Sequence, residues 1–389
     1  MELNLINLSD FDKNKLNVYY IENFVIPGKT AHAIQVENNL RALSKFCNLT
    51  LISYSKNNTK IKFCKHIAFE RPYYLKKFIP LSVFHLIYKL KNYNFENNSF
   101  LITRNPVIAY MLKNSFKNIL LEIHAFPNLK DLSFKSFLIN YITFSPFLHL
   151  LKNEKKIKFG VISKSLKNIL IAKKIESNRI FLVPDAVDIE KFNINVSKKK
   201  LRKLFNLPLE KKIITYVGSF QKWKGYYTFL KSYKYINEKE NYLFLLVGAE
   251  KKQINVLKKK FNHKNIVIWP FISHSVVPKI LKVSDILVIP NSKKYKISRE
   301  YTSPLKLFEY MAAKRPIIAS DLPSIREIVN ENEVVFFEPD NEKDLAIKIE
   351  NLANNEYLQN KLIENAFKKV QNYTWNKRAK YILSILKNY

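Results

Sequence analysis

Cysteine is scarce in this chain: Cys47 and Cys64 are the only two in 389 residues. Two cysteines cannot build a disulfide framework, and neither shows the spacing of a zinc site with histidine. We therefore expect a reducing compartment and no bound metal. The one Asp-x-Asp sequence, Asp10 to Asp12, lies near the N-terminus, where a turn is the simpler interpretation.

Long hydrophobic runs are also missing. The longest uncharged run, Ser136–Leu151, is too short to span a bilayer and contains Pro146. The opening residues, "MELNLINLSDFDKNK", carry acids where a signal peptide has a basic start, and no apolar core follows. We expect no membrane-crossing segment and a cytoplasmic location, with attachment to the inner leaflet of the plasma membrane at most peripheral.

Acidic residues are outnumbered: 32 Asp and Glu stand against 66 Lys and Arg, for a formal net charge of +34. Three interpretations are open: nucleic acid, an anionic membrane surface, or an A- and T-rich coding sequence that favours lysine codons. No helix-turn-helix, RNP or zinc-finger motif is present, so nucleic acid ranks last. An apolar content of 47% indicates a folded protein.

Apolar strand-like runs alternate with helical patterns along the whole chain, which is typical of an α/β fold with doubly wound parallel sheets. Helices are expected at 32–46, 276–282 and 342–352. We expect an N-terminal Rossmann-like domain (1–192), a C-terminal one (193–373) and a final helix (374–389) that packs back on the first domain. Two such sheets side by side would face their ligand sites into a shared central cleft. Strands are expected at 17–20, 49–53, 100–103, 119–123, 159–162, 212–217, 242–247, 265–269, 286–290 and 316–319.

The stretch "TSPLKLFEYMAAKRPIIASD" (302–321) carries a single carboxylate, Glu309, in an otherwise apolar helix. Ser303 suits the N-cap and Pro304 the first helical position, so the N–H groups of Leu305 and Lys306 would be free to bind a phosphate. Glu309, one turn on, would accept hydrogen bonds from sugar hydroxyls. The alternative is a solvated Glu309, which its apolar neighbours disfavour.

A second stretch, "ITYVGSFQKWKGYYTFL" (214–230), reads as a strand, a glycine and a helix opened by Lys-Gly. Gly218 would let a ligand approach the backbone. Lys224 would then reach the same place as the phosphate. The alternative is a surface lysine, which the dipole of the helix start opposes.

Together these stretches resemble the retaining glycosyltransferases of family 4, or group 1, which have the two-domain GT-B fold. "IPGKTAHAIQVENNLRAL" (26–43), "LEIHAF" (121–126), "GVISKSLKNIL" (160–170) and "VPDAVDIEKF" (183–192) match in the same order. "LLVGAE", "VSDILVIPN" and "YTWNKRAKYIL" complete the match. The resemblance covers nearly the whole chain and is most specific over 212–330.

The resemblance implies an N-terminal acceptor-binding domain and a C-terminal donor-binding domain. The family's ribose-binding glutamate falls on Glu309, and its phosphate-binding amides fall on Leu305 and Lys306. Its motif lysine falls on Lys224, and its histidine near the reacting sugar falls on His124. Further donor-side residues are Gly218, Ser219, Ser303, Pro304 and, through backbone around the nucleobase, Trp269, Phe271 and Ile272, with Asp285 and Pro290 structural; Gly28, Lys29 and His32 line the acceptor side.

The sequence departs from the family pattern at three places. The first glutamate of the family's Glu-x7-Glu pair is replaced by Tyr301, with Glu300 one position early. An arginine that often follows Gly218 is Ser219, and the glycine in the middle of the motif is Pro304. These departures leave open which residues would bind the donor sugar.

What the resemblance implies is transfer of a sugar from a nucleotide-diphosphate donor to a hydroxyl of a glycan or lipid-linked acceptor, with retained anomeric configuration. Neither metal nor cofactor is expected, and the nucleotide sugar is a substrate. Such an enzyme would serve a surface polysaccharide, a lipid-linked oligosaccharide or a glycoprotein glycan. Two other classes stay open: a nucleotide-sugar epimerase of the same fold, and a non-catalytic membrane- or nucleic-acid-binding protein.

The segment Arg71–Phe95 combines several Lys and Arg residues with many aromatic ones. Phe84, Ile87 and Tyr88 with the adjoining Lys89 and Lys91 resemble an interfacial amphipathic helix. We expect either docking on an anionic membrane surface or packing of the same face against the N-terminal sheet.

Overall fold

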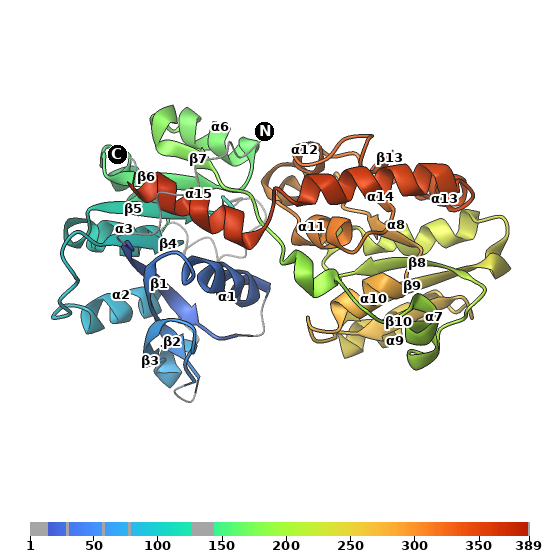
Figure 1. The fold of residues 1–389 in the computed structure, drawn as a ribbon, viewed down its shortest axis with the longest axis horizontal. Helices are drawn as coiled ribbons and strands as arrows, with labels where there is room; N and C mark the ends of the chain where they lie inside the picture. Colours follow the sequence, from blue (N-terminus) through green and yellow to red (C-terminus); the bar gives the residue numbers. More distant parts are fainter. Residues whose placement is uncertain (1–14, 29–30, 57–58, 77–78, 127–143, 388–389) are drawn as a thin grey trace. The chain divides into compact units, whose positions relative to one another are not determined.

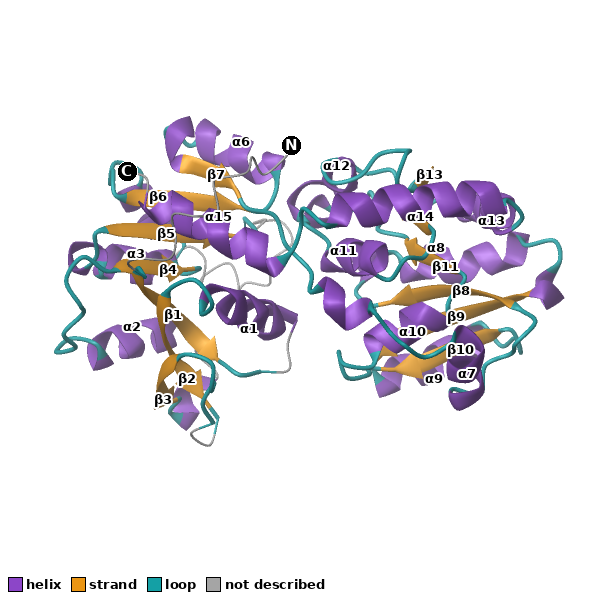
Figure 2. Ribbon diagram, in the orientation of Figure 1, coloured by secondary structure: helices purple, strands orange, loops and turns teal. Residues whose placement is uncertain are grey.

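The computed structural model describes residues 15–28, 31–56, 59–76, 79–126 and 144–387. It divides into two compact units, shown in Figures 1 and 2. Unit 1 combines the chain up to Pro184 with Trp375 onward, and unit 2 runs from Asp185 to Thr374. The first division therefore precedes the predicted position after Phe192. Two hydrogen bonds explain the earlier boundary, because they hold the chain after Pro184 to unit 2. The N–H of Asp185 donates to Ser303, and the N–H of Val187 donates to Tyr373 O.

Unit 1 is built on a seven-stranded sheet among the described residues, in the order β3-β2-β1-β4-β5-β6-β7, with every pair parallel. The strands β1, β4, β5 and β6 are almost wholly buried and mostly apolar, as expected for a sheet covered on both faces. The bounds are β1 Asn17–Val25, β2 Asn48–Ser55, β3 Lys65–Glu70, β4 Phe100–Thr103, β5 Asn118–Ile123, β6 Ile157–Val161 and β7 Ile180–Leu182.

The helices of unit 1 cover this sheet, and the last of them comes from the C-terminal end of the chain. Helix α15, red in Figure 1, lies beside α1 and β5. The side chains of Asn118 and Lys158 donate to carbonyls at its end, those of Leu386 and Ile385. The bounds are α1 Ala31–Leu43, α2 Ile79–Lys89, α3 Pro106–Met111, α5 Ser145–Leu151, α6 Lys164–Ala172 and α15 Trp375–Lys387.

Unit 2 has a six-stranded parallel sheet in the described residues, ordered β10-β9-β8-β11-β12-β13. The strands are β8 Lys212–Val217, β9 Tyr242–Ala249, β10 Ile266–Pro270, β11 Ile286–Ile289, β12 Ile317–Ser320 and β13 Val335–Phe337. The helices are α7 Lys198–Leu204, α8 Tyr226–Ser232, α9 Lys251–Lys260, α10 Val277–Val283, α11 Leu305–Ala312, α12 Pro323–Arg326, α13 Glu342–Ala353 and α14 Glu356–Val370. The strand order of this sheet reverses between β8 and β11, and open α/β sheets bind ligands at such a point.

The expected α/β architecture is confirmed, and the predicted strands all occur within a few residues of their places. Three further strands, β3, β7 and β13, were not predicted. Each lies at an edge of its sheet. An edge strand packs on one neighbour only, so its sequence needs a weaker apolar pattern, and β3 for example is mostly half-buried.

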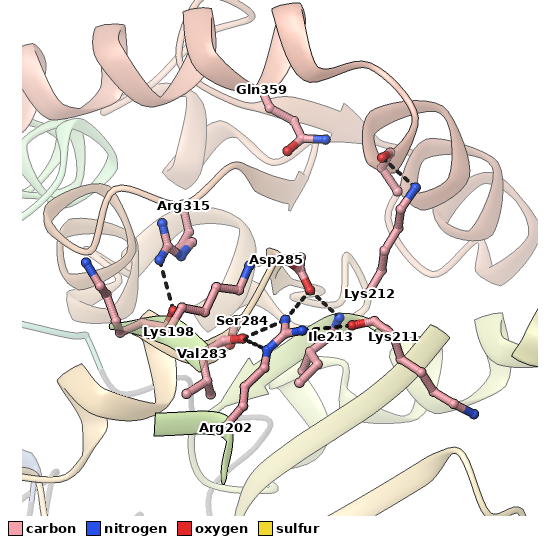
Figure 3. Close-up of polar contacts among 12 residues, drawn as sticks. Lys198, Arg202, Lys211, Lys212, Ile213, Val283, Ser284, Asp285, Arg315 and Gln359 are labelled. Carbon is pink, nitrogen blue, oxygen red and sulfur yellow. Dashed lines mark hydrogen bonds and ion pairs between the residues drawn. The ribbon is translucent and has the colours of Figure 1, made fainter. Parts of the chain in front are cut away.

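A buried polar cluster around Asp285 fastens α7 to the sheet of unit 2 (Figure 3). The Asp285 carboxylate accepts from Arg202 at 2.5 Å and from the N–H of Ile213 at 2.6 Å, and it pairs with Lys198. Arg202 also donates to Val283 O from two of its nitrogens. These contacts lie at the amino ends of β8 and β11, opposite the edge where a ligand would bind. Asp285 therefore lies where a structural residue is expected.

Helix α2 leaves part of its predicted apolar face exposed. Val83 and Leu86 are buried, whereas Phe84 is 37% exposed and Tyr88 is 72% exposed. Leu81, at 53%, extends the exposed row. Of the predicted face, Ile87 is half-buried and Phe84 contacts the Phe147 ring of α5, with centroids 6.5 Å apart, so the expectation of packing is wrong for Tyr88. None of the helices that the structure describes is long and apolar enough to cross a membrane.

Candidate active site

The glycine in the loop after β8 lets a lysine side chain lie directly against the backbone. Gly218 follows the strand, and its N–H donates to Val247 O on β9 at 2.9 Å. Its φ of +151° lies outside the range that most side chains adopt. A Cβ added there would lie 3.3 Å from Lys306 Nζ and 3.2 Å from the hydroxyl of Tyr216. The missing side chain thus lets Lys306 approach the end of the strand.

Lys306 buries the amino group of its side chain. Its Nζ is closed to solvent and makes no hydrogen bond to any described residue. It lies 4.3 Å from the centroid of the Tyr216 ring, a cation–π contact. Burial, followed by the charge of Lys224, holds the pKa of Lys306 well below its ordinary value. Such a group is costly to keep, and an arriving anion would satisfy it.

Lys224 supplies the second cation of the same place. Its Nζ donates to Ser219 Oγ at 2.8 Å and lies 5.1 Å from the Trp223 ring. Burial lowers its pKa. The next residue, Gly225, has φ of +65°, and a Cβ on it would lie 1.6 Å from Pro290 O. Only glycine fits there, so the Lys224 turn is fixed against the end of β11.

The start of α11 lies beside these lysines, and here the predicted N-cap, Ser303, and the predicted first helical residue, Pro304, are both wrong. Ser303 does not cap the helix: its hydroxyl accepts the N–H of Asp185 at 3.2 Å. Pro304 occupies the N-cap position, and the helix begins at Leu305. The N–H groups of Leu305 and Lys306 are in the first turn, where a helix offers no internal acceptor. The start of α11 therefore adds partial positive charge next to Lys306.

Glu309 lies one turn along α11 and has a partner that sequence analysis missed. The Nε2 atom of His274 is 2.7 Å from Glu309 Oε1. This hydrogen bond raises the pKa of His274. The side chain of Glu309 is 17% exposed, and its charge raises the pKa of Lys306, so carboxylate and ammonium are neighbours. Gly218, Ser219, Lys224, Lys306 and Glu309 are together called the β8–α11 site below.

The residues after β10 divide between core and surface. Trp269, near the end of β10, is half-buried and packs its ring against Phe205, with centroids 5.9 Å apart. Phe271 is 68% exposed, and its N–H donates to Ala249 O. Ile272 packs against the core of the unit. Of the three predicted nucleobase neighbours, Phe271 alone presents an exposed side chain.

In unit 1 the predicted histidine, His124, directly follows β5 at the carboxyl edge of the sheet. Its Nε2 is buried and makes no hydrogen bond to a described residue. Glu122 and Arg104 lie next to it, at the ends of β5 and β4. Sequence analysis missed both, because a charged residue at the end of a strand gives no pattern of its own.

The predicted acceptor-side residues follow β1. Gly28 is tightly packed: a Cβ there would lie 2.9 Å from the Cβ of Ala33. His32, in the first turn of α1, is exposed, and its ring meets that of Phe24 edge-on at 4.2 Å between centroids. Lys29 lies outside the described residues. In the part of the chain that the structure describes, no three His, Cys, Asp or Glu side chains gather as metal ligands would.

Residues 197–369 match the family Glycosyl transferases group 1. The match spans most of unit 2 and includes the whole β8–α11 site. The chain carries a group 1 glycosyltransferase domain. The family prediction is thereby confirmed at this level.

Among curated proteins, this chain is 25% identical over 260 residues to N,N'-diacetylbacillosaminyl-diphospho-undecaprenol alpha-1,3-N-acetylgalactosaminyltransferase of Campylobacter jejuni, covering 66% of each chain. The chain spans from 48% to 66% of the length of the curated relatives that it matches.

Solved structures of similar fold cover almost the whole chain. Sucrose-phosphate synthase from Thermosynechococcus elongatus has a TM-score of 0.73 at 17% identity, over 95% of this chain and 98% of that one. Anabaena HepE in complex with UDP and glucose has a TM-score of 0.72 at 11% identity, over 96% and 100%. At these identities the likeness establishes the fold, and the predicted GT-B fold is confirmed.

The glycosyltransferase domain departs from the family pattern at Tyr301, and the structure shows what stands there. Tyr301 is buried, and Lys296 Nζ lies 5.5 Å from the centroid of its ring. Glu300, one position earlier, pairs with Lys296 at 3.7 Å and with Arg299 at 3.8 Å. Tyr301 is thus a core residue, and Glu300 is held by two cations of its own segment.

Proposed function

We propose that this protein is a retaining glycosyltransferase that moves a sugar from a nucleotide-diphosphate donor to a hydroxyl of a glycan or lipid-linked acceptor. The observation that carries the proposal is the buried amino group of Lys306, which lacks a hydrogen-bond partner among the described residues. It lies beside Gly218, with Lys224 and the start of α11 next to it. A diphosphate is the ligand class that these groups fit best.

The roles follow from where charge develops. As the glycosidic bond breaks, negative charge grows on the departing nucleotide diphosphate. Lys306, Lys224 and the N–H groups of Leu305 and Lys306 are placed in advance to stabilise it, which is the largest usual source of catalysis. Glu309 accepts hydrogen bonds from the ribose hydroxyls. The family match and the UDP complex of the similar Anabaena structure support a nucleotide donor.

A thermal-shift screen with UDP, GDP, ADP and CMP, each free and sugar-linked, tests the donor site. One nucleotide is expected to raise the melting temperature, and the shift should be lost in Lys306→Gln. The matched control is Lys279→Gln, because Lys279 is exposed on α10 of the same unit. No shift with any nucleotide would overturn the proposal. Binding without sugar transfer would favour the non-catalytic alternative.

Retention and metal independence are parts of the same proposal. Family membership supports retention, and the lysines and helix start supply positive charge that a metal ion provides in other transferases. NMR of the product should show the anomeric configuration of the donor. Turnover should continue in EDTA at its rate in added Mg²⁺. An inverted product, or loss of turnover that Mg²⁺ restores, would reject the respective part.

For the acceptor side we propose contact with an anionic membrane near a lipid-linked acceptor. The relative from Campylobacter jejuni carries a diphospho-undecaprenol acceptor in its name. On α2, Leu81, Phe84 and Tyr88 are exposed apolar residues, and Lys89 follows them. Exposed aromatic rings beside lysines are typical of helices that lie in a membrane interface.

Flotation with liposomes tests this contact. Binding is expected with vesicles containing anionic lipid and not with neutral ones. The double variant Phe84→Ser, Tyr88→Ser should lose binding, while Tyr357→Ser should keep it, because Tyr357 is as exposed but lies on α14 of unit 2. Equal flotation with and without anionic lipid would reject docking and leave the donor-site proposal untouched.

A further inference from the structure

The C-terminal helix places an arginine inside the catalytic end of unit 1. The side chain of Arg378, on α15, is 4% exposed. Its Nη2 donates to Glu122 Oε1 at 2.5 Å, its Nη1 to Asn39 Oδ1 at 2.8 Å and its Nε to Pro184 O at 3.0 Å. Each of the three donors thus has its own acceptor, which fixes the guanidinium in one orientation.

Both carboxylate oxygens of Glu122 accept hydrogen bonds, one from Arg378 and the other from residues at the ends of neighbouring strands. Its Oε2 accepts the Tyr20 hydroxyl at 3.1 Å and Arg104 Nε at 3.2 Å. The same Oε2 is 3.9 Å from His124 Nε2. The side chain is 1% exposed, and the charges of Arg378 and Arg104 keep its pKa well below the ordinary value despite burial. Glu122 is therefore a buried anion shared between two guanidiniums, with the His124 ring nearby at 3.9 Å and not hydrogen-bonded to it.

His124 is neutral in this setting. Burial and the charge of Arg104 lower its pKa to about 4, Glu122 opposes this, and Arg378 adds to it. The other titratable groups around it come from β1 and α1: Tyr20 and Glu22 face Glu122, and His32 faces His124. A neutral imidazole can accept or donate a hydrogen bond to a sugar hydroxyl without adding positive charge beside it.

We propose that Arg378 is a positioning residue for catalysis, which fixes the Glu122 carboxylate beside His124 and thereby orients the imidazole at the reacting sugar. The part concerning the reacting sugar rests on the proposed function. The link needs α15 to return to unit 1, so the end of the chain contributes to the site and is more than a cover for the sheet. Two guanidiniums against one carboxylate leave net positive charge, and this charge disfavours protonation of the imidazole.

The first experiment is an NMR titration of His124 in the full chain, which needs no substrate. The resonance is assigned by its loss in His124→Gln. In Arg378→Gln a positive charge disappears, so the pKa of His124 should rise by about one unit. In Glu122→Gln the negative charge disappears, so it should fall. Arg41→Gln, at a half-exposed arginine of α1, is the matched control and should leave it unchanged.

The second experiment is the pH profile of turnover. In Arg378→Gln kcat at neutral pH should fall about tenfold or more, with the donor KM within about twofold, since the imidazole is misplaced while the donor site is intact. The acidic limb of the profile should move to higher pH. Arg378→Lys keeps the charge and should restore the limb and part of kcat.

The outcomes separate the two proposals. Opposite shifts of the His124 pKa in the two variants support the positioning pair even if no donor is found. An unchanged His124 pKa in Arg378→Gln, with a folded protein by circular dichroism, overturns it even if transfer is demonstrated. Should Arg378→Gln fail to fold, a wild-type kcat in Arg378→Lys also overturns it, because the shorter, non-planar cation keeps the charge but cannot make all three contacts.

Discussion

His274 Nε2 lies 2.7 Å from Glu309 Oε1, and this hydrogen bond joins the loop after β10 to the second turn of α11. It leaves the second carboxylate oxygen of Glu309 for a ligand and restrains the side chain that would bind it. His274→Ala should therefore raise the donor KM by about tenfold with little change in kcat, because a hydrogen bond to a charged group is lost in ground state and transition state alike.

Steady-state kinetics with varied donor measures the His274 effect. Glu309→Ala should raise KM further than His274→Ala does. His149→Ala is the control, since His149 is an exposed histidine of α5. A fall in kcat at unchanged KM would contradict the expected role in donor binding.

Donor binding should take up protons through Lys306. Burial and the nearby Lys224 hold the pKa of Lys306 below its ordinary value in the free protein. A bound diphosphate favours the charged ammonium and raises that pKa again, so a proton is taken from solvent. Calorimetry at pH 8 in buffers of different ionisation enthalpy should reveal the uptake. It should shrink in Lys306→Met, and a binding heat that is the same in all buffers would contradict it.

Asp285→Asn should destabilise the protein by about 3 kcal/mol, because Arg202 and Lys198 then lose their anion and the buried guanidinium stays behind. Urea unfolding followed by circular dichroism measures the loss. Donor affinity should be unchanged at low urea, since Asp285 lies at the amino edge of the sheet. Glu331→Gln, at an exposed surface pair with Arg326, should leave the stability nearly unchanged.

Glu22 should make stability fall as the pH rises. Burial raises the pKa of Glu22 to about 8, far above the usual 4.5. Between these values the folded chain binds a proton that the unfolded chain does not, so the stabilisation is present at pH 4 and is lost toward pH 8. Glu22→Gln removes this dependence. The amide oxygen of the new side chain can still accept the backbone N–H of Arg104, which lies 2.7 Å from Glu22 Oε1 in the wild type.

Melting temperatures at pH 5 and pH 8 test the Glu22 prediction. The difference in melting temperature, Glu22→Gln minus wild type, should increase by about 3 °C from pH 5 to pH 8. Glu70→Gln, at an exposed carboxylate of β3, should show no such gain. A parallel pH dependence of variant and wild type would mean that Glu22 is already ionised in the folded chain.

The sequence by itself determined the α/β class, the central strands and the segment 302–321. Buried parallel strands are short apolar runs, and amphipathic helices repeat every few residues, so both are visible locally. The lysine, glycine and glutamate positions of unit 2 were found for the same reason. They lie at strand ends and helix starts, which a local pattern marks.

Only the tertiary structure decided which of these side chains meet. His274 and Glu309 are 35 residues apart, and Arg378 and Glu122 are 256 apart. The order of strands in the sheet brings the first pair together, and the return of α15 to unit 1 brings the second. Ser303 likewise bonds to Asp185 rather than to its own helix. Such pairs are fixed by packing between distant segments, and no local periodicity records them.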